Sequence, residues 1–143
     1  MDLVEKDVAN ALTNKIVRNF GDSDYRKDRY IFDQITRLPD HYIARRVPVS
    51  TLLASLDQVE LFVILDPHPN NASCVKCLSN QFGFENELAY KVSVDEARLF
   101  FSYEDCDMYL LNVRGDLIAV GCHEDSFERG ERIVWTPIPI AET

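Results

Sequence analysis

A tight-turn sequence at residues 112–116 dictates how the last third of the chain has to fold. These residues read Asn-Val-Arg-Gly-Asp, with asparagine at the first turn position and Gly115 where the backbone needs a left-handed conformation. A turn of this kind joins two antiparallel strands through a type I turn and a glycine bulge. Because the segments on both sides are mostly apolar, we predict a hairpin whose strands contribute to the core.

The pairing across this turn determines which side chains are buried. We predict that the two strands pair outward from Asn112 and Asp116, which makes one face of the hairpin wholly apolar. The opposed pairs on that face are Leu110 with Ile118, Met108 with Val120, and Cys106 with Cys122. Cys106 and Cys122 are therefore expected to be small buried hydrophobes.

Helical patterns dominate the first half of the chain. Residues 3–20 have apolar side chains at helical spacing, and residues 23–37 are predicted to form a second helix. A short helix is expected to begin at Ser50. Further along, Ser93 and Glu96 have the spacing of a capping box, which predicts another substantial helix after them.

Strand patterns complete the expected fold. Residues 61–65 form a continuous apolar run, which is typical of a strand covered on both faces. Further extended segments are expected at residues 41–49, 88–92 and 132–140. In the last of these, Pro137 and Pro139 suit an edge strand because they blunt outward pairing.

These elements predict an α+β protein. Helices from the N-terminal half and one from mid-chain would pack on a mainly antiparallel sheet formed largely by the C-terminal half. The length of 143 residues, without a repeat or a linker, predicts a single domain spanning residues 1–143. With 46 % hydrophobic residues, the chain can bury a core without disulfides or a structural metal.

The charge balance argues against two broad classes of partner. The chain has 24 acidic and 15 basic residues, which gives a formal net charge of −9. Nucleic-acid binding needs cations that displace counterions from phosphates, and docking on anionic lipid needs cations as well. We therefore expect no direct nucleic-acid partner and no membrane partner.

The lengths and positions of the apolar segments indicate in which cellular compartment the protein is expected. Residues 1–7 are charged and lack the apolar run of a secretory signal, and no segment reaches the ~20 apolar residues that span a bilayer. The protein is therefore expected to be cytoplasmic. Its four cysteines should then be reduced.

Six acidic residues gather at the open end of the predicted hairpin. They come from residues 104–107 and 124–128, and their mutual repulsion costs stability unless a partner opposes it. Tyr109 is predicted to lie beside them, and an aromatic anchor with a charged rim is typical of protein interfaces. The predicted partner-binding residues are Glu104, Asp105, Asp107, Tyr109, Glu124 and Asp125. A solvated charged surface without a partner is the alternative interpretation.

Cys74 and Cys77 form the sharpest local motif, Cys-Val-Lys-Cys. Two cysteines at this spacing can chelate zinc or, at a helix N-terminus, exchange a disulfide. Zinc needs two further ligands, and the adjacent candidates Cys122 and His123 point to opposite sides of the predicted strand. We therefore expect no metal. Because no histidine has a placed nucleophile beside it and no glycine-rich loop is present, we also expect no catalytic residues and no cofactor. A thiol-redox or zinc-binding protein that uses Cys74 and Cys77 is the alternative.

An acidic α+β domain without catalytic motifs resembles the small immunity proteins with which bacteria neutralise their own toxins. The resemblance covers size, charge and fold class. It implies a non-enzymatic module that blocks a basic, nuclease-like toxin through an acidic surface, with association accelerated by opposite charges. A regulatory subunit of a larger complex is another function that these features fit.

Overall fold

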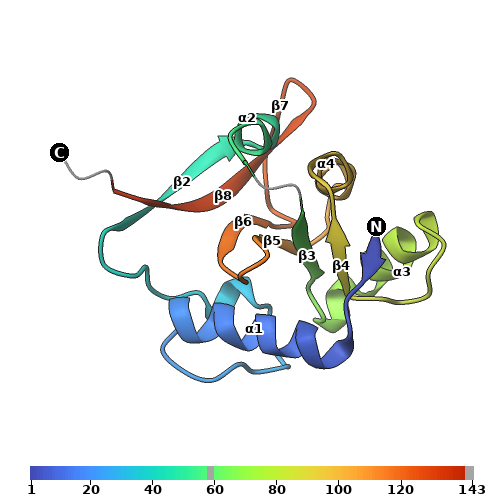
Figure 1. Ribbon diagram of the computed structural model, residues 1–143, viewed down its shortest axis with the longest axis horizontal. Helices are drawn as coiled ribbons and strands as arrows, with labels where there is room; N and C mark the ends of the chain where they lie inside the picture. The colour runs from blue at the N-terminus through green and yellow to red at the C-terminus, as the bar shows by residue number, and fades with distance from the viewer. Residues whose placement is uncertain (58–59, 141–143) are drawn as a thin grey trace.

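An eight-stranded antiparallel sheet forms the centre of the computed structural model, which describes residues 1–57 and 60–140 (Figure 1). The strands are β1 (Asp2–Leu3), β2 (Tyr42–Pro48), β3 (Leu61–Leu65), β4 (Ala89–Val92), β5 (Met108–Leu111), β6 (Leu117–Gly121), β7 (Phe127–Glu128) and β8 (Glu131–Pro139). Their order is β1-β4-β3-β5-β6-β8-β2, with β7 paired to β8. The helices are α1 (Lys6–Phe20), α2 (Val49–Ala54), α3 (Ala72–Gln81) and α4 (Val94–Phe101), and 3₁₀ turns cover Phe32–Gln34 and Pro69–Asn71. The predicted α+β class is confirmed.

Helices cover both faces of this sheet, so its central strands are buried from two sides. α1 and residues 21–41 lie against one face, whereas α2, α3 and α4 lie against the other (Figure 1). In β3, Val63 and Leu65 belong to the core with α3 and α4, and Ile64 belongs to the core with α1. The prediction that residues 61–65 are covered on both faces is confirmed. Within the described ranges, no helix combines the length and the apolar character that crossing a membrane requires.

The capping box at the start of α4 is present in full. The Ser93 N–H donates to Glu96 Oε1 at 2.9 Å, and the Glu96 N–H donates to Ser93 Oγ at 3.2 Å. These bonds satisfy two backbone donors that the start of a helix leaves unpaired, and so the helix begins at Val94. α1, α2, β2 and β4 also lie where the sequence predicts them.

Residues 23–37, all of which the structure describes, form a loop with one 3₁₀ turn instead of the predicted helix. The Ile31 N–H donates to Asp66 Oδ2 at 2.8 Å, and the Phe32 N–H donates to the Tyr109 hydroxyl at 2.8 Å. These backbone donors therefore bond to side chains of the sheet rather than to carbonyls one turn earlier. The helix prediction is wrong because these tertiary hydrogen bonds override local propensity.

The hairpin turn forms where its sequence predicts, but the register changes a short distance from it. The Asn112 N–H donates to the Asp116 carbonyl at 3.0 Å, as the turn type requires. Farther from the turn, a β-bulge shifts the pairing, so that Met108 lies opposite Gly121 rather than opposite Val120. The predicted register is wrong from this point outward. Alternation could not reveal the shift, because every residue of β5 is buried.

The bulge also separates the two cysteines that the predicted register places opposite each other. Cys106 is buried, as expected, with 2 % of its surface exposed. Cys122 is only half-buried, because the shift brings it to the end of β6. The expectation of a buried side chain is therefore confirmed for Cys106 and wrong for Cys122.

β2 and the last part of β8 extend from the sheet as a two-stranded arm (Figure 1). β8 pairs with β2 at seven positions but with β6 only through Val120 and Trp135. Pro137 and Pro139 explain the difference, because they lack the N–H groups that a longer ladder to β6 would use. The prediction of an edge strand is wrong, since β8 lies between β6 and β2. The prolines nevertheless end pairing on one side of it.

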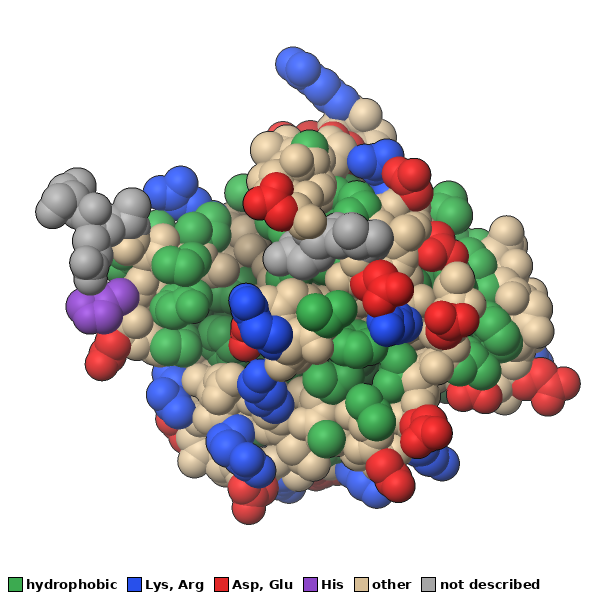
Figure 2. Space-filling model, in the orientation of Figure 1, with side chains coloured by type: hydrophobic (Ala, Val, Ile, Leu, Met, Phe, Trp, Pro, Cys, Tyr) green, Lys and Arg blue, Asp and Glu red, His purple; other side chains and the backbone are tan. Residues whose placement is uncertain are grey.

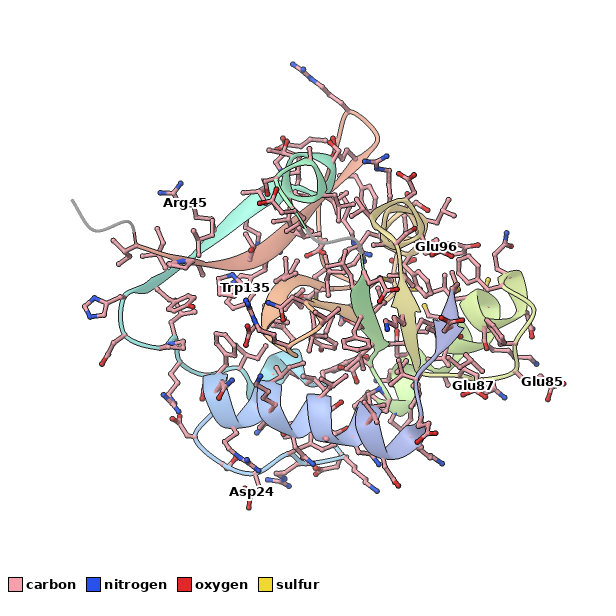
Figure 3. All side chains as sticks on the ribbon, viewed as in Figure 1. Asp24, Arg45, Glu85, Glu87, Glu96 and Trp135 are labelled. Carbon is pink, nitrogen blue, oxygen red and sulfur yellow. The ribbon has the colours of Figure 1, made fainter. Side chains whose placement is uncertain are left out.

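A hollow of about 790 Å³ lies between this arm and the C-terminal end of α1. On the face that Figure 2 shows, hydrophobic side chains gather on the arm, and lysine and arginine side chains lie on the neighbouring α1 side of the molecule. Trp135 lies at the base of the arm, where its ring packs edge-on against Phe32 with 5.4 Å between centroids (Figure 3). The arm is therefore held to the body of the protein mainly by side-chain packing.

Gly115 allows the hairpin turn to pack against α1. Its φ is +85°, and a Cβ atom there would lie 2.8 Å from Leu12 Cδ2. We expect Gly115→Ala to lower the free energy of unfolding by about 2–3 kcal/mol, because displacement of the Leu12 side chain adds to left-handed strain. Urea unfolding followed by circular dichroism measures this loss.

Gly83→Ala is the matched control for this prediction. Gly83 has a φ of +82°, and no described atom lies within 4 Å of its Cβ position. Its substitution should therefore cost only the backbone strain, about 1–2 kcal/mol. Equal losses in the two variants would contradict close packing of the turn on α1.

Candidate functional site

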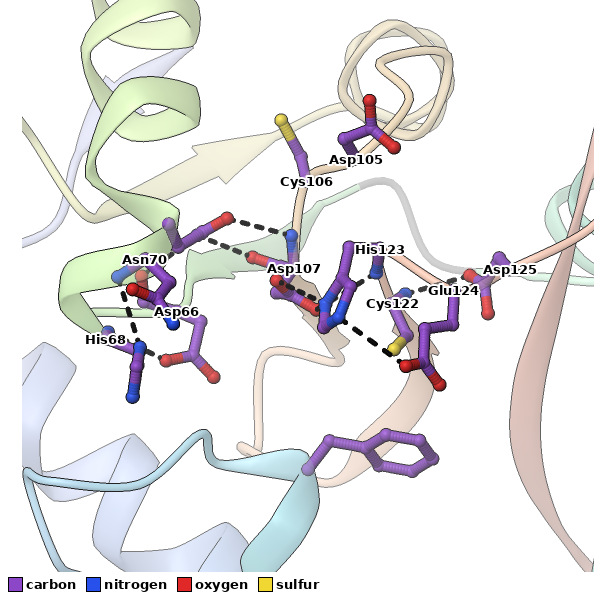
Figure 4. A network of polar contacts seen from close by, with 12 residues as sticks. Asp66, His68, Asn70, Asp105, Cys106, Asp107, Cys122, His123, Glu124 and Asp125 are labelled. Atoms are coloured by element: carbon purple, nitrogen blue, oxygen red, sulfur yellow. Dashed lines mark hydrogen bonds and ion pairs between the residues drawn. The ribbon is translucent and has the colours of Figure 1, made fainter.

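The ends of three strands meet at one edge of the sheet and place polar side chains together (Figure 4). Asp66 follows β3, Asp107 precedes β5, and His123 lies just after β6. Since β3 and β6 both pair antiparallel with β5, their last residues adjoin the first residues of β5. The topology of the sheet thus assembles this cluster.

Asp107 and His123 form the centre of the cluster. His123 Nδ1 lies 3.0 Å and 3.1 Å from the two carboxylate oxygens of Asp107, and the His123 N–H donates to Oδ1 at 3.0 Å. The Asp107 carboxylate is the main cause that raises the pKa of His123 above its ordinary value. Asp107 is 4 % exposed, and its N–H donates to Asn71 Oδ1 at 3.1 Å. The carboxylate therefore has a fixed position.

Asp66 and Tyr109 anchor the loop beside this pair. The Tyr109 hydroxyl donates to Asp66 Oδ2 at 2.7 Å, and the His68 N–H donates to Asp66 Oδ1 at 2.9 Å. Burial raises the pKa of the Asp66 carboxyl and of the Tyr109 hydroxyl. The ring of Tyr30 stacks on His68 at 4.0 Å between centroids and lies 5.4 Å from the ring of His123.

Arg132 forms a buried ion pair behind the cluster. Its side chain is 1 % exposed, and its Nε lies 3.2 Å from Asp125 Oδ2. The other oxygen of Asp125 lies 2.7 Å from Arg46 Nη1. Nη2 of Arg132 donates to the carbonyls of Cys106 at 2.8 Å and Cys122 at 3.1 Å. The guanidinium therefore joins β8 to the start of β5 and the end of β6.

A hollow of about 320 Å³ opens in front of the cluster. Its lining residues are Tyr30, Phe32, Asp33, Arg46, Asp107, Cys122, His123 and Glu124. Glu124 Oε1 lies 3.8 Å from His123 Nε2. The hollow thus exposes an imidazole whose orientation a buried carboxylate fixes.

The structure divides the predicted partner-binding residues into two groups. Glu104, Asp105 and Glu124 are exposed, as a contact role requires. In contrast, Asp107 and Tyr109 are buried, and the Asp125 side chain is 1 % exposed. Their predicted places on the surface are wrong, because each is bonded to another group inside the protein.

The cysteines are also placed differently from the sequence prediction. The bulge brings Cys122 Sγ, a His123 ring nitrogen and an Asp107 oxygen within 4.8 Å of one another, although the predicted register points Cys122 and His123 apart. Cys74 donates to the Asp105 carbonyl at 3.2 Å and Cys77 is exposed on α3. In the described part of the chain, neither belongs to such a group of three ligand atoms. A function for Cys74 and Cys77 stays a prediction.

Sequence reasoning missed Asp66, Asn71 and Arg132, which hold the cluster together. Asp66 could have been recognised from the sequence as a site residue, because it is a carboxylate directly after the buried run of residues 61–65. Arg132 offered none, since an arginine in a strand is usually exposed. The role of Asn71 depends on its distance from Asp107 in space, which the sequence does not contain.

Comparison of the chain with protein-family models, curated proteins and solved structures gives no match. The geometry of the site itself indicates which ligands it suits. That geometry combines buried carboxylates, each held by a hydrogen bond or an ion pair within the protein, with exposed carboxylates such as Glu124. Such a surface favours cations or cationic side chains as ligands.

The buried ion pair gives a direct test of the network. We expect Asp125→Asn to lower the free energy of unfolding by about 3–5 kcal/mol, because it leaves the guanidinium of Arg132 buried without a counter-ion. The double variant with Arg132→Met should recover most of this loss. Asp28→Asn removes an exposed ion-pair partner of Arg26 and should cost less than about 1 kcal/mol. Similar losses from Asp125→Asn and Asp28→Asn in urea titrations would contradict a stabilising role of the buried ion pair.

Proposed function

We propose that this chain is a non-enzymatic protein-binding module that neutralises a basic partner in the cytoplasm, as immunity proteins of bacteria do with toxins. Binding would occur through the acidic end of the molecule. The acidic end comprises Glu104, Asp105, Glu124 and Glu128.

Unpaired charge at the acidic end is the observation that supports this proposal. All four side chains are exposed, and among the described residues no lysine or arginine nitrogen lies within 4.0 Å of their carboxylates. Some other surface acids are paired with a cation, for example Asp116, which lies 3.4 Å from Lys15, and Glu60, which lies 2.8 Å from Lys91, whereas exposed Asp24 and Glu85 are in no ion pair among the described residues. The acidic end therefore keeps a negative field that cations of a partner can neutralise.

The surroundings of His123 favour binding over catalysis. Its Nδ1 faces Asp107 and its Nε2 faces Glu124, and among the described residues no hydroxyl is hydrogen-bonded to the ring. A general base needs the proton of a nucleophile within hydrogen-bond reach. The acids around His123 instead increase the negative field of the surface.

A basic partner would associate rapidly with such a surface. Opposite fields raise association rates from about 10⁵–10⁶ M⁻¹s⁻¹ toward about 10⁸ M⁻¹s⁻¹ at low salt. A protein that blocks a toxin benefits from this speed because it has to bind before the toxin acts. Carboxylates of the acidic end would occupy a cationic cleft in which phosphates of a nucleic acid otherwise bind.

Charge reversal tests the proposal. The chain is immobilised and used to capture proteins from a lysate of its source cells, and captured proteins are identified by mass spectrometry. We expect one strongly basic protein from the wild type and its loss from the variant Glu104→Lys/Glu124→Lys. For the captured protein, the association rate should fall about 10-fold or more in the variant and become less sensitive to salt.

Asp24→Lys/Glu85→Lys is the matched control, because it makes the same change in net charge at exposed positions elsewhere (Figure 3). This variant should capture the same protein with nearly unchanged kinetics. Equal effects of the two double variants would show that net charge matters and the acidic end does not. Failure of the captured protein to lose its activity when bound would contradict a neutralising role.

A further inference from the structure

Three donor atoms of different chemistry meet at the end of β6. They are a carboxylate oxygen of Asp107, the sulfur of Cys122 and a ring nitrogen of His123, and all lie within 4.8 Å of one another. Among the residues that the structure describes, this is the one group of three such ligands at this spacing. Ligands of a tetrahedral zinc ion lie about 3–4 Å apart, because each is about 2.0–2.3 Å from the metal. The present separations of up to 4.8 Å are somewhat wider than that, so the side chains would have to rotate inward to hold the ion.

The backbone around these donors is fixed on both sides. The Asp107 carbonyl accepts from the Asp66 N–H at 2.9 Å and from Asn71 Nδ2 at 3.1 Å. The Cys122 N–H donates to Asp125 Oδ2 at 2.8 Å, and the His123 N–H donates to Asp107 Oδ1 at 3.0 Å. A metal ion would therefore find its ligands arranged in advance, with little ordering of the chain on binding.

We propose that Asp107, Cys122 and His123 bind a zinc ion. A thiolate, an imidazole and a carboxylate together suit a borderline-soft divalent cation, whereas magnesium and calcium prefer oxygen ligands throughout. The hollow of about 320 Å³ in front of the cluster leaves room for a fourth ligand, such as water. This inference goes beyond the proposed function and does not depend on it, because metal binding is measured on the chain alone.

Glu124 adds an independent observation. With Nδ1 of His123 directed at the metal, the ring proton lies on Nε2, and Glu124 Oε1 is 3.8 Å from that nitrogen. A metal-binding histidine commonly donates its second ring N–H to a carboxylate, which orients the ring and raises its basicity as a ligand. At 3.8 Å this carboxylate is beyond hydrogen-bond reach, so Glu124 would act as a positioning residue for His123 once its exposed side chain moves closer to Nε2.

Cobalt provides the probe, since it occupies zinc sites and is coloured. The full chain is freed of metal with a chelator, and cobalt is added while absorption is recorded. We expect saturation at one cobalt per chain, with a sulfur-to-cobalt charge-transfer band and the strong visible bands of four-coordinate cobalt. Zinc should then displace the cobalt and remove both features.

Substitutions distinguish this site from other thiols. Cys122→Ser should remove the charge-transfer band, whereas Cys74→Ser/Cys77→Ser should keep it. Glu124→Gln should keep the band but weaken zinc binding about 10-fold, as loss of an orienting carboxylate does. Glu104→Gln, which removes the same charge without contacting His123, should leave zinc binding unchanged. Circular dichroism checks that each variant is folded.

The opposite results overturn the proposal. Absence of a saturable band in the wild type excludes the site, and this result requires no variant to fold. A band that disappears in Cys74→Ser/Cys77→Ser assigns the metal to those cysteines instead. Equal affinities of Glu124→Gln and Glu104→Gln for zinc would exclude the positioning role of Glu124.

Discussion

The buried guanidinium of Arg132 holds the functional end of this protein together. It enters from β8 and lies over Gly121, where a Cβ atom would be 3.1 Å from Nη1. A buried charge is costly without a counter-ion, and Asp125 supplies it from the loop after β6. Through this pair and its bonds to two carbonyls, the position of β8 determines the course of the chain that presents His123.

Several of the acidic residues that contribute to the net charge of −9 are bonded inside the protein and add little negative charge to its surface. The side chains of Asp66, Asp107 and Asp125 are buried and bonded within the protein, so they contribute little to contacts with a partner protein. The exposed field at this end comes from fewer carboxylates than the sequence pattern indicates. Of these carboxylates, Glu124 lies 3.8 Å from Nε2 of His123, so charge recognition and metal binding would share this residue.

Much of the fold could be predicted, because local rules control its elements. The capping box at Ser93, the turn at residues 112–116 and the apolar run at residues 61–65 each formed the expected structure. Residues 23–37 did not form the predicted helix, because two of their backbone N–H groups donate hydrogen bonds to the side chains of Asp66 and Tyr109. A local pattern cannot show that competition, because its partners lie far away in the chain.

The site was less predictable than the fold for a related reason. Its geometry depends on a bulge of one residue in β6, which reverses the faces of everything beyond it. Where both faces of a strand are buried, as in β5, apolar and polar residues do not alternate, and no pattern records the register. The exposure of Glu104 and Glu124 was predictable, but the burial of Asp107 and Tyr109 was not.

The prolines of β8 also separate the central strands from the arm, because they limit backbone pairing between β8 and β6. Because β8 meets β6 at a single backbone pair, the arm of β2 and β8 is joined to the central strands mostly through side chains, such as the Thr136 hydroxyl that donates to the Ile118 carbonyl. The seven pairs between β2 and β8 form a ladder of their own. Amide exchange measured in the arm would show whether this ladder opens separately from the central strands.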